Sequence, residues 1–156
     1  MTPQLRPRLR WLVPVLVLLP AMSLSVAAYG SSSPAKPSAQ AQITTNWKAF
    51  FSGMTPASRK IALVQDGSSF AKVIEGQASS PMAKSVAATV SKVTLAASKK
   101  TATVVYSLTM GGKPALSNQK GEAVLQGGTW KVGAQSFCVL LKMEQVKVPV
   151  CSGKAA

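Results

Sequence analysis

Four side chains of this 156-residue sequence have the chemistry to line a ligand site or to polarise a substrate: Trp47, Asp66, Tyr106 and Trp130. A tyrosine hydroxyl close to a carboxylate can polarise a carbonyl group inside an apolar pocket, and tryptophan rings offer a large apolar surface. In the alternative interpretation, the three aromatic residues belong to an ordinary core, and Asp66 is part of an Asp-Gly turn that ends a helix. We keep the four as candidate cavity-lining residues and predict that none is catalytic.

The residues that most other enzyme mechanisms need are absent from this sequence or lie apart in it. The sequence has no histidine, which serine nucleophiles need as a base and which zinc sites use as a ligand. The glycine pairs precede predicted strands rather than a helix, so they do not form a phosphate-binding loop. The acidic residues fall on separate predicted elements, which argues against a catalytic carboxylate pair; they are Asp66, Glu75, Glu122 and Glu144. We therefore predict a non-enzymatic protein without a cofactor or a metal.

The first 28 residues have the pattern of a secretory signal peptide. Three arginines precede an apolar stretch over 11–24, which ends in small residues. We expect cleavage after Ala27 or Ala28 and a secreted or extracytoplasmic protein of a bacterial envelope. The alternative is an uncleaved anchor over 11–28, which approaches the ~17–25 residues that span a bilayer. Membrane contact is expected only through this segment, if it is retained.

The two cysteines, Cys138 and Cys151, lie in the part that would be exported. An even cysteine count in an oxidising compartment predicts one disulfide. Closing so short a loop is expected to stabilise the fold by about 3 kcal/mol. The alternative is a pair of buried thiols.

The charge of the exported part restricts its partners. Without residues 1–28, fifteen basic and four acidic residues leave a net charge of +11, and Arg59 is the only arginine. Because nucleic-acid-binding proteins cluster arginine and lysine, we predict no nucleic-acid partner. A scattered positive charge instead attracts anionic lipids or wall polymers, weakly and in a salt-dependent way. The alternative is that the charge serves solubility alone.

Composition divides the rest of the chain. Residues 29–42 are rich in Ser, Pro and Ala and are predicted to form a disordered linker. A single domain is expected over 43–151, followed by a short tail over 152–156.

The domain is expected to begin with three short helices. The first would be capped by Thr45 or Asn46, with its apolar side chains at helical spacing: Trp47, Phe50, Phe51 and Met54. The second would follow Thr55-Pro56, and the third would lie between Asp66-Gly67 and Pro81.

After Pro81 the hydrophobic period changes to that of strands. Residues 101–110 alternate, and the predicted buried side is formed by Ala102, Val104, Tyr106, Leu108 and Met110. A similar but weaker pattern covers 85–95, and two further strands are expected over 115–126, with a possible bulge at Gly121, and over 129–141. Three helices followed by a four-stranded meander predict an α+β fold with a curved antiparallel sheet.

Two stretches resemble a known family. They are WKAFFSGMTPASRKIALVQDGSSF, over 47–70, and GGTWKVGAQSFCVLL, over 127–141, which is followed by Cys151. Together they are similar to the C-terminal domain of the actinobacterial low-molecular-weight secreted antigen family known from mycobacteria, over about 43–151. The resemblance implies export, no settled biochemical role and a pairing of Cys138 with Cys151. It also implies a cystatin-like cone related to nuclear transport factor two.

The sequence thus predicts an exported accessory or binding module with weak electrostatic affinity for anionic envelope components. The alternative is a small-ligand-binding cone, or a degenerate enzyme, with an apolar cavity. An open, mostly apolar cavity with a few polar groups would favour the alternative. An interior filled by its own side chains would favour the first interpretation.

Overall fold

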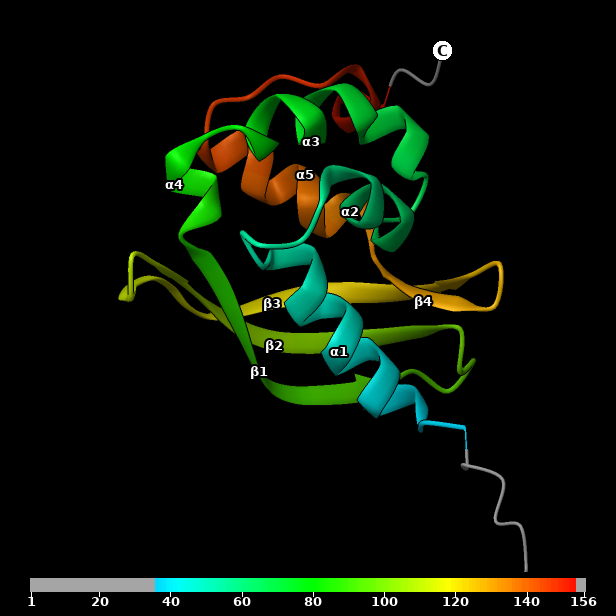
Figure 1. The fold of residues 1–156 in the computed structure, drawn as a ribbon. Coiled ribbons are helices and arrows are strands. Elements are labelled where there is room, and N and C mark those ends of the chain that lie inside the picture. Colours follow the sequence, from blue (N-terminus) through cyan, green and yellow to red (C-terminus); the bar gives the residue numbers. More distant parts are fainter. Residues whose placement is uncertain (1–35, 154–156) are drawn as a thin grey trace, which may run out of the picture. The chain divides into compact units, whose positions relative to one another are not determined.

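A computed structural model describes residues 36–153. The predicted signal peptide with its cleavage region at Ala27 and Ala28, the first part of the predicted linker and the last three residues lie outside the described residues. Four helices precede four strands, and one helix follows them (Figure 1): α1 (Ala39–Phe51), α2 (Ala57–Leu63), α3 (Ala71–Ala78), α4 (Pro81–Lys84), β1 (Val86–Leu95), β2 (Thr101–Met110), β3 (Lys113–Gln126), β4 (Thr129–Val132) and α5 (Ala134–Met143). Two short 3-10 helices, η1 (Gly67–Phe70) and η2 (Pro149–Ser152), complete the described chain.

The predicted α+β class and the four-stranded meander are confirmed. The strands pair antiparallel in the order β1-β2-β3-β4. Register shifts in the β1–β2 and β2–β3 pairs mark irregularities of the kind that increase local bending. Helix α1 lies across the curved sheet and packs against β1 and β4, with α2 beside it (Figure 1). The likeness to a nuclear-transport-factor-two cone stays a prediction.

The first helix begins earlier than the sequence pattern indicated. The Oγ of Ser38 accepts a hydrogen bond from the N–H of Ala41 at 3.2 Å, so Ser38 is the N-cap in place of Thr45 or Asn46. Residues 39–42, predicted as linker, are therefore helical. The helix gains a further buried side chain, Ile43, while Met54 lies beyond the helix end and is 86% exposed.

The stretch predicted as the last strand, 129–141, is only a strand as far as Val132. From Ala134 the chain is helical, and α5 buries Phe137, Cys138, Leu140 and Leu141. This spacing of apolar residues fits one face of a helix, but a short apolar run also fits a buried strand, which explains the wrong prediction. Pro81 likewise begins α4 rather than closing α3.

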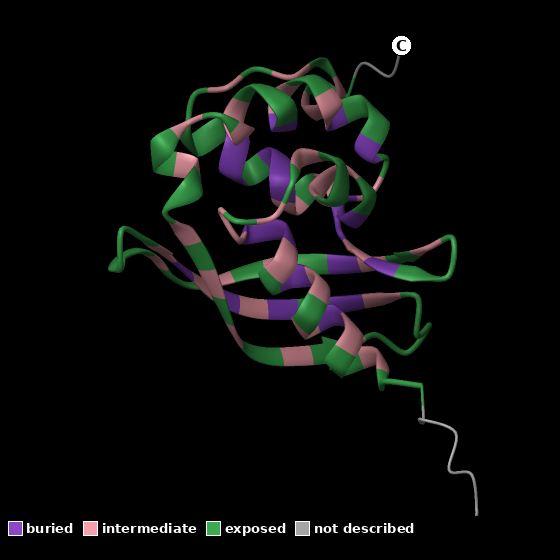
Figure 2. Cartoon of the chain, in the orientation of Figure 1, coloured by how far each residue is buried: buried purple, intermediate pink, exposed green. Residues whose placement is uncertain are grey.

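The core lies between the helices and one face of the sheet (Figure 2). The predicted alternation in β2 is confirmed for Ala102, Val104, Tyr106 and Leu108, whereas Met110 is exposed. Gly121 is not at a bulge but pairs in register with Val104. A side chain there would come within 2.8 Å of the Trp47 ring, so the glycine allows this ring to pack on β3.

Candidate ligand-binding site

The three aromatic candidates are part of the packed core. Trp47, Tyr106 and Trp130 are almost fully buried, and the rings of Trp47 and Tyr106 lie 5.2 Å apart. Burial raises the pKa of the Tyr106 hydroxyl. The Nε1 donor of Trp47 has no hydrogen-bond partner within the described part of the chain. None of the three lines the cavity described below, so their packing matches the core alternative.

Asp66 lies at the end of the sheet away from Tyr106. It adopts a left-handed backbone conformation, with φ of 51°, and its Oδ1 accepts a hydrogen bond from Gln126 at 2.8 Å. Gln126 is seven residues along β3 from Gln119, the strand partner of Tyr106, which is roughly 23 Å at ~3.3 Å per residue. The structure therefore does not bring the tyrosine and the carboxylate together.

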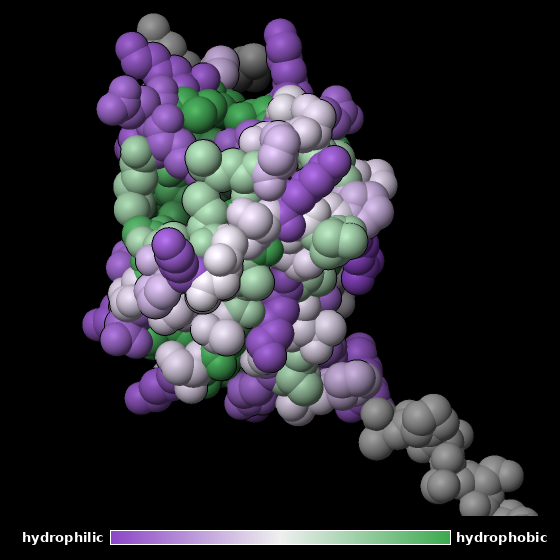
Figure 3. All heavy atoms as spheres, turned by 60° about the vertical axis from the view of Figure 1, so that its left-hand side comes forward, coloured by the Kyte–Doolittle hydropathy of each residue, from purple (hydrophilic) through white to green (hydrophobic). Residues whose placement is uncertain are grey.

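A cavity of about 550 Å³ lies elsewhere, where β2 ends and β3 begins. Helices α1 to α5 and the first residue of β1 contribute to its other walls. Its lining is mainly apolar and includes Phe50, Ile74, Leu108, Leu116, Phe137 and Leu140. Figure 3 shows hydrophobic residues gathered at the left of the view, with hydrophilic residues above and below them. The sequence analysis allowed for an apolar cavity but did not predict which residues line it, because its walls come from segments far apart along the chain.

Three methionines with exposed side chains belong to the cavity lining. Met82 from α4 and Met143 from α5 are 63% and 53% exposed, and Met110 at the end of β2 is 37% exposed. Methionine side chains are flexible and polarizable, which suits surfaces that adapt to varied apolar ligands. Exposed apolar side chains grouped at one opening are also typical of binding surfaces.

A few polar groups lie among the apolar ones, notably Lys60, Gln77 and Glu144. The Nε2 of Gln77 donates a hydrogen bond to the Oε2 of Glu144 at 2.8 Å, which links α3 to the residue after α5. Burial lowers the pKa of the Lys60 ammonium. The cavity lining therefore includes one lysine whose charge is partly desolvated.

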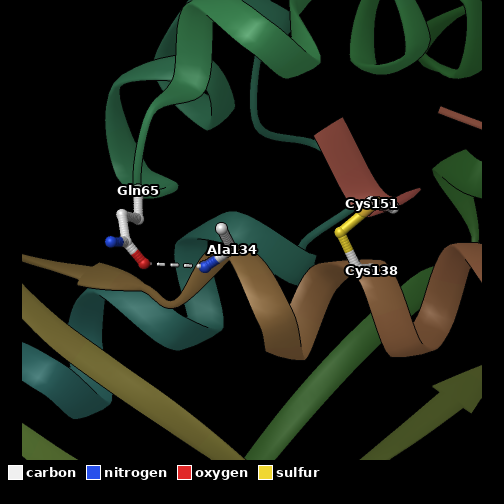
Figure 4. The surroundings of a disulfide bond; sticks show 4 residues. All are labelled: Gln65, Ala134, Cys138 and Cys151. Atoms are coloured by element: carbon white, nitrogen blue, oxygen red, sulfur yellow. Dashed lines mark hydrogen bonds between the residues drawn. A yellow bond between two sulfur atoms is a disulfide. The ribbon is translucent and has the colours of Figure 1, made fainter. Parts of the chain in front are cut away.

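A disulfide holds the α5 wall of the cavity in place. Cys138 and Cys151 are joined, as predicted, so α5 is tied to η2 (Figure 4). The closed loop contains four cavity-lining residues: Leu140, Met143, Glu144 and Val146. At the N-terminus of α5, the Oε1 of Gln65 accepts a hydrogen bond from the N–H of Ala134 at 3.1 Å. The helix is thus held at its first residue and at its middle by residues outside it.

Two further findings concern the described residues 36–153. They contain no group of three or more acidic or cysteine side chains placed to bind a metal ion. None of their helices combines the length and the apolar character needed to cross a lipid bilayer.

Comparison with curated proteins finds no match. The family model described as low molecular weight antigen MTB12, C-terminal domain, matches residues 35–148. The matched region includes every helix and strand from α1 to α5 and stops three residues before Cys151. Because the match covers most of the sequence and the whole of the α+β core, the chain belongs to the family of the low molecular weight antigen MTB12 C-terminal domain.

Proposed function

We propose that this protein is an exported, non-enzymatic binding protein of the bacterial envelope that holds a small apolar ligand in the cavity beside α5. The supporting observation is the cavity itself, with its volume of about 550 Å³ and its mainly apolar lining. Ligand pockets of ~300–1,000 Å³ typically combine such a lining with a few placed polar groups. Of the two interpretations drawn from the sequence, the geometry favours small-ligand binding.

The arrangement of ionisable groups supports binding rather than catalysis. Lys60 and Glu144 are the ionisable residues in the cavity lining, and Glu144 already accepts a hydrogen bond from Gln77. Tyr106, the candidate for polarising a substrate, is buried elsewhere in the core. The lining therefore contains a single carboxylate, and not the pair that two-carboxylate catalysis needs.

Export is supported by two independent features. The N-terminal pattern is that of a signal peptide with cleavage near Ala27 or Ala28. The Cys138–Cys151 disulfide is of the kind that persists in oxidising compartments. N-terminal sequencing of the protein isolated from cells tests processing, because an intact residue 1 would favour the anchored alternative.

Binding can be tested with a neutral fluorescent probe, N-phenyl-1-naphthylamine. We expect saturable binding to the disulfide-bonded protein and a loss of about tenfold in affinity for Leu116→Trp, which fills the cavity. The matched control is Leu125→Trp, on the same strand but outside the lining, which keeps wild-type affinity. Absence of saturable binding to the wild-type protein, or equal binding by both variants, would contradict the proposal.

A second candidate function is electrostatic affinity for anionic lipids or wall polymers. The described residues include fourteen basic and four acidic ones, a net charge of +10. Such a field attracts anionic surfaces in a salt-dependent way. We expect binding to isolated envelopes to fall strongly between about 0.05 M and about 0.5 M salt, because the Debye length shortens. Retention that is equal at both concentrations would rule this affinity out.

A further inference from the structure

The chemical class of the ligand can be inferred from the charges in the cavity. Lys60 lies in the last turn of α2 and lines the cavity together with apolar side chains such as Phe50 and Leu108. Its ammonium is partly removed from water, and burial is the only cause of its lowered pKa. A cation in such a place is destabilised unless a partner compensates it.

The carboxylate in the cavity lining is already engaged. Glu144 accepts the hydrogen bond from Gln77 at 2.8 Å. An anionic group entering the cavity would be attracted by Lys60 and repelled by Glu144. The two charges together therefore define one favourable position for an acidic group, next to Lys60.

We propose that the ligand is an amphipathic acid, with an apolar body in the cavity and a carboxylate or phosphate group paired with the Lys60 ammonium. This inference rests on the proposed function, since it specifies what the cavity binds. The apolar body would gain from contact with the aliphatic and methionine side chains. The acidic group would form a charge-assisted hydrogen bond in a partly desolvated place, where such bonds are strong.

The same geometry selects against neutral ligands of equal size. A neutral molecule would displace water from Lys60 without supplying a negative charge, so part of the binding free energy would be lost to desolvation. An acid of the same chain length supplies the missing partner. The ratio of the affinities for the acid and for its neutral analogue therefore measures the contribution of Lys60.

The experiment compares decanoic acid, decyl phosphate and decanol as competitors of N-phenyl-1-naphthylamine on the disulfide-bonded protein at neutral pH. We expect either acid to displace the probe at a concentration about tenfold lower than decanol does. Stronger displacement by the carboxylate or by the phosphate identifies which acidic group the site prefers.

Variants assign the preference to Lys60. Lys60→Met is expected to weaken both acids by about tenfold without weakening decanol, and Lys60→Arg to retain the preference for acids. Lys72→Met removes an equal charge from an exposed position on α3 outside the cavity lining and is expected to change neither. Glu144→Gln removes the repelling charge and is expected to strengthen the acids.

The outcomes separate this inference from the proposed function. If the probe binds but wild-type protein does not distinguish the acids from decanol, the inference is overturned and the cavity remains a binding site for apolar ligands. The same holds if Lys72→Met abolishes the preference as fully as Lys60→Met does. If the probe does not bind the wild-type protein at all, the proposed function fails as well.

Discussion

The interior of this domain is filled at one place and open at another, although the same strand contributes to both. Around Tyr106 of β2, the rings of Trp47 and Phe51 lie 5.2 and 5.5 Å from the tyrosine ring, and Gly121 leaves room for the indole. Two residues further along β2, Leu108 lines a cavity of about 550 Å³. Protein interiors are normally packed to the density of organic crystals. The filled region therefore serves stability, whereas the open region leaves room for the proposed ligand.

The two regions also differ in what holds them. The filled region depends on side chains of α1 that insert against the sheet. Phe50 and Phe51 of α1 also line the cavity, but its shape depends on α5. This helix is bonded covalently to Cys151, and its Ala134 N–H donates a hydrogen bond to Gln65. Substitutions in the two regions are thus expected to separate stability from ligand binding.

The largest effect is expected in the filled region. Trp47→Ala removes a side chain that is 1% exposed and leaves a void beside Tyr106 and Gly121. We expect a loss of about 3–5 kcal/mol in the free energy of unfolding, measured by chemical denaturation. Ile74→Val, on the cavity wall, is the comparison and is expected to cost about 0.5–1.5 kcal/mol. Equal losses for the two variants would contradict the distinction between the regions.

The next effect comes from the disulfide. Replacing both Cys138 and Cys151 by alanine opens a loop that spans 13 residues, with an expected loss of about 3 kcal/mol. Four cavity-lining residues lie within this loop. We therefore expect a lower probe affinity even for the fraction of the double variant that stays folded. Val139→Ser, at an exposed position of α5, is the control with wild-type affinity. Unchanged probe binding by the folded double variant would show that the disulfide does not shape the cavity.

A smaller effect is expected at the N-terminus of α5. Gln65→Ala removes the side-chain oxygen that accepts the N–H of Ala134, and loss of such a cap costs about 1 kcal/mol. Thermal unfolding measures the loss, and Gln65→Glu, which retains an acceptor at a helix N-terminus, is expected to restore stability. A melting temperature that is the same for all three proteins would show that the hydrogen bond does not stabilise α5.

The smallest expected effect is a pH dependence due to Lys60. Its folded-state pKa lies below the ordinary value of 10.5, so between the two values the unfolded chain binds more protons. Stability contributed by this group therefore rises with pH in that window. The pKa of Tyr106 is raised by burial. Its contribution to stability therefore falls as the pH rises above its ordinary pKa of 10.0. Lys60→Met is expected to be more stable than wild type near neutral pH, and this advantage is expected to shrink towards pH 10.5. A constant difference in melting temperature across this range would exclude the effect.

Local patterns predicted the parts of the fold that depend on neighbours along the chain. The alternation over 101–110 assigned β2 and its buried face, since side chains of a strand alternate between the two faces of a sheet. The helical spacing of Trp47, Phe50 and Phe51 placed these rings on one face of α1. The pairing of Cys138 with Cys151 followed from there being only two cysteines.

The candidate site could not be predicted in the same way. Met82, Met110 and Met143 are far apart in the sequence, and only the folding of α4 and α5 around the end of β2 brings them to one cavity. The sequence candidates, Trp47, Asp66, Tyr106 and Trp130, were chosen by residue chemistry, and none of them lines this cavity. Residue type alone does not distinguish an aromatic side chain that fills a core from one that lines a pocket.

The amino-acid sequence by itself determined the α+β class, the meander, the positive charge and the pattern of an exported protein, because periodicity and composition are local properties. The tertiary structure decided that residues 134–143 form a helix, since Gln65, which accepts the N–H of its first residue, and Cys151, its covalent partner, lie outside it. It also decided where the interior stays open. That outcome depends on how side chains from separate elements fill a common volume, which no local pattern records.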